Sequence, residues 1–181
     1  SIFQGDSSVA EYLTNMPFDH IFFTGSPAVG KHVMGAAAKN LASVTLELGG
    51  KSPVIIHESA NLIKAADSIV FSKFLNNGQT CIAPDYLMVH ESIYYTFLDK
   101  LRISVSNQFG DEDGFINNKD YGRLVTKAHF QRIKDLLDDS INSGASIAVG
   151  GKTDSDNKFI SPTILTDVKE DSAIMNQEIF G

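Results

Sequence analysis

The stretch His20-Ile21-Phe22-Phe23-Thr24-Gly25-Ser26-Pro27-Ala28-Val29-Gly30 decides the fold class of this chain. It begins with a compact apolar segment, residues 20–24, which stops at Gly25 and therefore predicts a buried strand. Pro27 suits the first turn of a helix, where its missing N–H is harmless, and apolar residues recur at helical spacing as far as Asn40. A strand that passes through a tight turn into a helix is the unit from which α/β folds are built.

Strands and helices continue to alternate in both directions from this stretch. Upstream, a short helix is expected around Val9 and Leu13. Downstream, the hydrophobic pattern predicts strands at residues 44–48, 54–56, 86–89, 146–149 and 163–165. The same pattern predicts helices at residues 62–74, 93–105 and 130–141. This alternation predicts an α/β fold, a three-layer sandwich with a largely parallel sheet.

The composition of the 181 residues excludes several classes of partner. The net charge is −7 and Lys and Arg do not cluster, which argues against nucleic acid and anionic membranes. No apolar run approaches the ~20 residues that span a bilayer, and no basic-then-apolar signal segment stands at the start. We therefore expect a cytoplasmic protein. The chain opens on Ser1-Ile2-Phe3 and stops at Phe180-Gly181 without a closing element, so we expect a piece of a longer protein.

Cys81 is the only cysteine, so the chain forms neither an intrachain disulfide nor a cysteine-based zinc cluster. The five histidines are scattered and none pairs at H-x-x-x-H spacing, so we predict no metal site. A lone cysteine is most often a small buried apolar residue. Cys81, however, follows Asn76-Asn77-Gly78-Gln79-Thr80, a turn at the end of a predicted helix, where loops carry function. A thiolate there is a candidate nucleophile.

Glu47 is a candidate general base. It lies alone between Leu46 and Leu48, at the end of a strand that we expect to be buried, and a desolvated carboxylate is a better proton acceptor. The alternative is a glutamate on the solvent face of a half-buried strand. Gly49-Gly50 favours the functional interpretation, because paired glycines let the backbone come close to a ligand.

The turn from Gly25 to Lys31 is a candidate anion site, because it opens a helix whose dipole favours negative charge. It nearly matches the phosphate loop G-x-x-x-x-G-K-[ST], so a nucleotide- or phosphate-binding module is the alternative function. His32 occupies the eighth position and lacks the hydroxyl that would hold Mg²⁺. A tight strand-to-helix turn without a ligand is the remaining interpretation.

Four motifs, in this order, resemble those of the aldehyde dehydrogenase superfamily. They are Gly25-Ser26-x-x-Val29-Gly30, Glu47-Leu48-Gly49-Gly50-Lys51, Gly78-Gln79-x-Cys81 and Glu178-Ile179-Phe180-Gly181. Their spacings also match, with Cys81 thirty-four residues after Glu47 and Glu178 ninety-seven after Cys81. Phe18-Asp19-His20-Ile21 and the stretch from Cys81 to Tyr86 are most similar to the class 3 branch, which acts on fatty and aromatic aldehydes.

The resemblance implies an oxidoreductase that converts an aldehyde to a carboxylic acid with NAD or NADP. Cys81 would form a thiohemiacetal with the aldehyde, hydride transfer would leave a thioester, and Glu47 would activate the water that hydrolyses it. Glu178 would hold the hydroxyls of the nicotinamide ribose. The implied cofactor-binding residues are Gly25, Ser26, Val29, Gly30, Leu48, Gly49, Glu178 and Phe180.

The resemblance also implies a domain organisation. Residues 1–45 would be the last strand–helix portion of the cofactor-binding domain, and residues 46–181 a Rossmann-like catalytic domain truncated at its C-terminal end. An Asn that completes the oxyanion site and most of the adenosine pocket would lie outside the chain, so we expect residues 1–181 alone to be inactive. The longer protein would be a homodimer.

Overall fold

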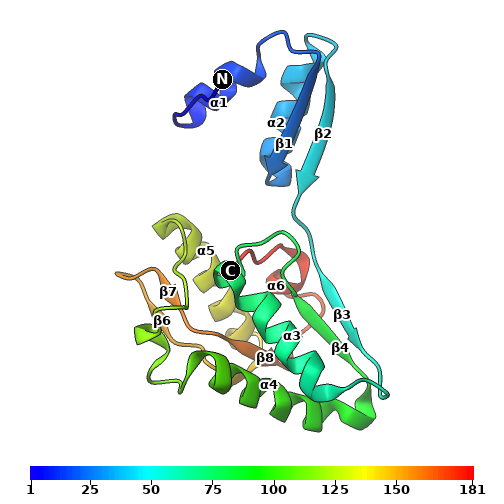
Figure 1. The fold of residues 1–181 in the computed structure, drawn as a ribbon, viewed down its shortest axis with the longest axis vertical. Helices are drawn as coiled ribbons and strands as arrows, with labels where there is room; N and C mark the ends of the chain where they lie inside the picture. Colours follow the sequence, from blue (N-terminus) through cyan, green and yellow to red (C-terminus); the bar gives the residue numbers. More distant parts are fainter. The chain divides into compact units, whose positions relative to one another are not determined.

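Strand β1 (His20–Gly25) and helix α2 (Pro27–Ala38) follow each other directly, as the sequence predicts. They belong to a computed structural model that describes residues 1–181 (Figure 1). These residues pack as two units, Ser1–Gly49 and Gly50–Gly181. The division keeps strand β2 (Ser43–Leu48) whole in the first unit, whereas a boundary after residue 45 would cut it.

The first unit is a parallel two-stranded ladder packed against α2. Strands β1 and β2 pair in a register that sets Thr24 opposite Glu47 and Gly25 opposite Leu48. Ser26 caps α2, accepting a hydrogen bond from the backbone N–H of Val29. Helix α1 (Ser7–Thr14), where the sequence predicts one, contacts α2.

The prediction that β1 is buried is wrong in this structure. Its residues alternate between exposed and half-buried, and the Phe22 side chain is 66% exposed. Such alternation is typical of a ladder with one covered face and one open face. The covered face is the one that contacts α2.

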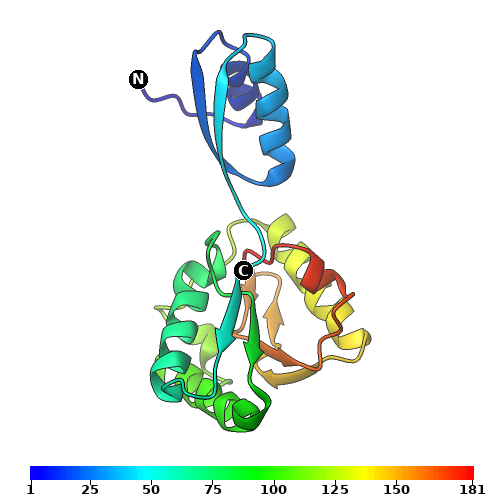
Figure 2. The ribbon, with the colours of Figure 1, turned by 90° about the vertical axis from the view of Figure 1, so that its right-hand side faces the viewer.

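The second unit has three layers. Figure 2 shows its strands between helices α3 and α4 on one side and α5 and α6 on the other. Its helices, including the 3₁₀ turns named η, are α3 (Leu62–Phe74), η1 (Leu75–Gly78), η2 (Glu91–Ile93), α4 (Tyr94–Phe109), η3 (Phe115–Asn117), α5 (Lys127–Asn142) and α6 (Ala173–Asn176). Its strands are β3 (Pro53–Ile56), β4 (Tyr86–Val89), β5 (Ser146–Val149), β6 (Thr153–Asp154), β7 (Phe159–Ile160) and β8 (Ile164–Thr166). The α/β class is confirmed.

The ladders of the second unit are of both kinds. Strands β3 and β4 pair in parallel, and helix α3 forms the connection between them, as the sequence predicts. The pairs β5–β8 and β6–β7 are antiparallel, which the sequence pattern did not indicate. Residues 150–163, between β5 and β8, contain only the short pair β6–β7 and no helix, and a parallel connection needs a crossover.

Two apolar clusters hold the second unit together. The larger lies where α3 and α4 meet the strands, and its most buried side chains include Val70, Phe97 and Val105. The smaller packs α5, through Phe130, Ile133 and Leu137, against Leu124 before the helix and Ile160 after it. None of the helices is both long and apolar enough to span a lipid bilayer.

Candidate active site

Cys81 is exposed and lies in the turn between η1 and β4. Just before the turn, at the end of η1, stand three successive residues of left-handed backbone conformation, Asn76 (φ 53°), Asn77 (φ 56°) and Gly78 (φ 72°). Asn and Gly are the residues that adopt this conformation at least cost. The sequence therefore reverses the chain sharply after α3 and presents the thiol outside the core.

Gln79 holds this turn in place. Its amide Nε2 donates to the carbonyl oxygens of Asn76 (3.0 Å) and Arg123 (3.2 Å), and its Oε1 accepts from the Val125 N–H (3.0 Å). One side chain thus ties the residues before Cys81 to a segment more than forty positions further along. The sequence indicates the motif that contains Gln79. It does not indicate the hydrogen-bond partners of Gln79, because these depend on tertiary contacts.

The turn lies against the end of the chain. A Cβ added to Gly78 would stand 2.6 Å from the carbonyl carbon and oxygen of Gly181. Two of the motifs found in the sequence, around Cys81 and Glu178, are therefore neighbours within the second unit.

Glu178 carries an unpartnered acceptor. Its Oε1 is buried and has no hydrogen-bond partner. Burial raises the pKa of the Glu178 carboxyl, while the charge of Arg132 lowers it and that of Asp85 raises it further. A buried acceptor without a partner is costly, so this oxygen suits a ligand that brings a donor such as a hydroxyl group. Phe180, two residues on, is partly exposed, and its ring lies 5.9 Å from that of His129.

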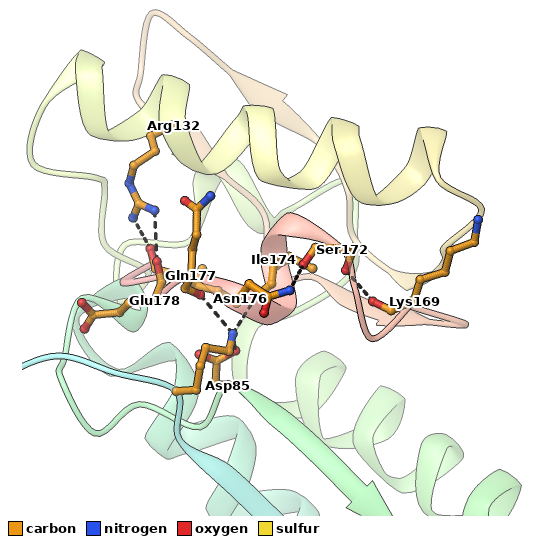
Figure 3. Close-up of polar contacts among 10 residues, drawn as sticks. Asp85, Arg132, Lys169, Ser172, Ile174, Asn176, Gln177 and Glu178 are labelled. Atoms are coloured by element: carbon orange, nitrogen blue, oxygen red, sulfur yellow. Dashed lines mark hydrogen bonds and ion pairs between the residues drawn. The ribbon is translucent and has the colours of Figure 1, made fainter.

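Lys51, the last residue of the Glu47–Lys51 motif, is also bound to this region. Its ammonium pairs with the buried carboxylate of Asp85 and donates to the carbonyl oxygens of Ile174 (2.7 Å) and Gln177 (3.1 Å). Figure 3 labels these three partners. A further lysine, Lys73, lies nearby. Burial lowers the pKa of Lys73 to about 8, Asp85 raises it and Lys51 lowers it.

The strand-to-helix turn of the first unit has the form that the sequence predicts. Ser26 is the N-cap, and Val29 is 47% exposed on the first turn of α2. Gly30 is buried, and a Cβ there would lie 3.0 Å from Leu48 Cδ2, so this glycine lets the helix approach β2. Lys31 and His32 are exposed.

The expectation that Glu47 is buried is wrong. Its neighbours Leu46 and Leu48 are half-buried on the side of α2, whereas Glu47 is exposed. Side chains alternate across a strand, so the carboxylate points from the open face of the ladder, together with its exposed register partner Thr24. Glu47 and Leu48 thus lie at the end of β2, with Gly49 directly after it, in the first unit; Cys81, Glu178 and Phe180 lie in the second.

The sequence profile of the aldehyde dehydrogenase family matches residues 1–181. The chain belongs to this family. It is 49% identical over its full length to AldX of Bacillus subtilis (strain 168), a protein named as an aldehyde dehydrogenase. The chain covers 41% of AldX. It is 46% identical over 91% of its length to the dimeric NADP-preferring aldehyde dehydrogenase of Rattus norvegicus, of which it covers 35%.

A solved structure gives the same family fold. The substrate-bound state of AldH from Staphylococcus aureus superimposes with a TM-score of 0.92 at 44% identity, over 99% of this chain and 38% of that one. The chain thus spans about two fifths of the length of the aldehyde dehydrogenases that it matches. The resemblance read from the four motifs is confirmed at the level of the family.

Proposed function

We propose that the protein containing this chain oxidises an aldehyde to a carboxylic acid with NAD or NADP. The observation that carries the proposal is the arrangement in the second unit: an exposed cysteine, in a turn fixed by Gln79, beside a segment whose Glu178 has a buried, unpartnered oxygen. Membership of the aldehyde dehydrogenase family supports the same reaction.

Cys81 is the proposed nucleophile. The thiol gives up its proton to solvent, the thiolate attacks the aldehyde carbon, the C–S bond forms as the C=O π bond breaks, and the carbonyl oxygen takes up the negative charge of a thiohemiacetal. Backbone N–H groups near Cys81 stabilise this oxyanion. NAD or NADP, when bound, supplies the acceptor for the hydride that leaves the same carbon. A thioester to Cys81 then remains.

Glu47 is the proposed general base for hydrolysis. It takes a proton from water, the hydroxide adds to the thioester carbon, and the C–S bond breaks to release the carboxylic acid and the Cys81 thiolate, to which Glu47 returns the proton. The exposure of Glu47 leaves the carboxylate accessible to water.

Proposed cofactor-binding residues lie in each unit. Glu178 holds the ribose hydroxyls through the carboxylate oxygen that lacks a partner, and Phe180 lies in the same segment. Residues 1–45 are the proposed portion of the cofactor-binding domain, with the helix N-terminus at Ser26 for the pyrophosphate. Residues 46–181 are the proposed catalytic domain. The remaining proposed contacts come from Gly25, Val29, Gly30, Leu48 and Gly49.

The finer assignments concern the substrate and the assembly. We propose a fatty or aromatic aldehyde as substrate, and a cytoplasmic homodimer as the active form. The name of the rat relative, a dimeric NADP-preferring enzyme, supports the dimer and the use of NADP.

The deciding experiment measures NADH and NADPH production by the full-length protein over a panel of aldehydes. Aliphatic aldehydes of increasing chain length and benzaldehyde should be oxidised, and Cys81→Ala should abolish turnover. Incubation with Mg²⁺ and ATP tests the phosphate-loop alternative. ATP hydrolysis together with no aldehyde oxidation would overturn the proposal.

A further inference from the structure

Side chains hold the segment that carries Glu178 by binding its backbone carbonyl oxygens, and these side chains approach from two sides. On one side Lys51 donates to the carbonyl oxygens of Ile174 and Gln177. On the other side two residues of helix α5 bind the next three carbonyls in turn. Arg132 Nη1 donates to Glu178 O (3.0 Å), Arg132 Nη2 donates to Ile179 O, and His129 Nε2 lies 2.7 Å from Phe180 O. Figure 3 shows the Arg132 guanidinium facing this backbone.

These contacts replace the hydrogen bonds that regular structure would supply. Residues 177–181 lie outside every helix and strand, so their carbonyl oxygens have no ladder partner. Hydrogen bonds from a charged donor are stronger than neutral ones, and the rigid fork of an arginine fixes direction as well as distance. Here the fork spans two successive carbonyls, which defines the orientation of the peptide plane that follows Glu178.

Helix α5 is a rigid support for this contact. Arg132 and His129 are three residues apart and therefore lie on one helical face. Phe130, Ile133 and Leu137 on the same helix are buried in the smaller apolar cluster, which also packs against Ile179. The position of the Glu178 backbone is thus tied to the core.

We propose that Arg132 is a positioning residue, which orients the Glu178 carboxylate toward the cofactor ribose by fixing the peptide groups on its C-terminal side. This inference rests on the proposed ribose-binding role of Glu178. Arg132 acts through Glu178 and makes no contact of its own with the ribose in this scheme. His129, on the same side as Arg132, and Lys51, on the opposite side, bind further carbonyl oxygens of this segment.

Cofactor affinity of the full-length protein, titrated without aldehyde, provides the first test. Arg132→Met should weaken NAD⁺ or NADP⁺ binding by about tenfold, which corresponds to about 1.4 kcal/mol. Arg132→Lys, which keeps the charge but loses the fork, should retain an intermediate affinity. Lys134→Met is the matched control, because this lysine of the same helix pairs only with Asp138 on the surface, and its affinity should stay within about twofold of the parent.

A double mutant separates positioning through Glu178 from an independent effect. If Arg132 acts only through Glu178, the variant that combines Arg132→Met with Glu178→Gln should bind the cofactor as Glu178→Gln does. Additive losses would overturn the inference. If Glu178→Gln weakens binding while Arg132→Met does not, the positioning role is wrong and the ribose role stands. If Glu178→Gln leaves affinity unchanged, the ribose role fails and this inference fails with it.

Hydrogen exchange of the cofactor-free protein gives a readout that needs no activity. In Arg132→Met the amides of residues 177–181 should exchange faster, while those of α3 and α4 should not change. Unchanged exchange at residues 177–181 would overturn the inference. If Arg132→Met fails to fold, Arg132→Lys carries both measurements, since it should still loosen the segment at one of the two carbonyls.

Discussion

Gly78 and Gly181 lie so close in the second unit that a Cβ on Gly78 would stand 2.6 Å from the carbonyl carbon and oxygen of Gly181. The contact joins the turn before the nucleophile candidate to the segment that holds Glu178. Gly78 also has a positive φ of 72°, so its backbone conformation favours glycine and its surroundings require it.

Gly78→Ala should therefore destabilise the protein and displace the Cys81 turn. We expect a loss of about 1–3 kcal/mol in the free energy of unfolding, measured with urea, and a fall in aldehyde oxidation. Gly144→Ala is the control, because Gly144 also has a positive φ (107°) but faces open space. It should cost less stability and leave activity unchanged. Equal losses of stability and activity in both variants would contradict a role for the Gly181 contact.

Cys81 should react readily with iodoacetamide in the native protein, because its side chain is exposed. We expect the rate, followed by mass spectrometry, to lie within roughly tenfold of the rate in urea. Cys81→Ser should take up no label within residues 1–181, since these residues contain no other thiol. Absence of the adduct after several hours under native conditions would count against an accessible nucleophile.

Glu47→Gln should slow turnover in the full-length protein more than it weakens substrate binding. A general base contributes typically ~10²–10⁴-fold to the rate, and Gln keeps the size of the side chain while losing the proton acceptor. Acylation of Cys81 comes before the step in which Glu47 takes a proton from water. Stopped-flow traces should therefore show a burst of NADH followed by slow turnover. Glu11→Gln, an exposed glutamate of the same unit, should behave as the parent. An unchanged steady-state rate in Glu47→Gln would exclude the assignment.

The burial of Lys73 predicts a pH dependence of stability. The pKa of Lys73 falls from 10.5 to about 8 on folding, so the unfolded chain binds more protons between these values. The free energy of unfolding is therefore lowered by the whole cost of burying the Lys73 ammonium below pH 8. It rises as the pH increases from 8 to 10.5, because the amine is then already neutral in the folded protein. Lys73→Met should stabilise the protein at pH 7 by on the order of 1–3 kcal/mol, and by less at pH 10. Lys64→Met, an exposed lysine of the same helix, should show no such difference in urea unfolding.

The order of helices and strands could be predicted from hydrophobic period, since that signal is local. The exposure of β1 and β2 could not, because an apolar run such as residues 20–24 indicates a preference for burial and not which layer covers each face. The antiparallel pairs were missed for a related reason. Strand direction depends on the connection, and the two residues of β6 and of β7 are too few to give a periodic pattern.

The candidate site could be predicted as a set of motifs, because four short stretches in register resemble those of one family, although the stretch around Glu178 is uninformative alone. The residues that hold those stretches in place could not. Arg132 lies within an ordinary amphipathic helix, and its contacts reach more than forty residues along the chain. Gln79 likewise binds Arg123 and Val125. No local pattern distinguishes such a side chain from a surface one.

The contact between Gly78 and Gly181 has a consequence for biosynthesis. A ribosome adds about 5–20 residues per second, so Gly181 is made on the order of 5–20 seconds after Gly78. During that interval the thiol of Cys81 has already been synthesised while its structural neighbour has not. The nascent protein therefore carries the Cys81 turn through several seconds of translation before the residue that packs against it exists, so this part of the site assembles only after residues 78–181 have all been made.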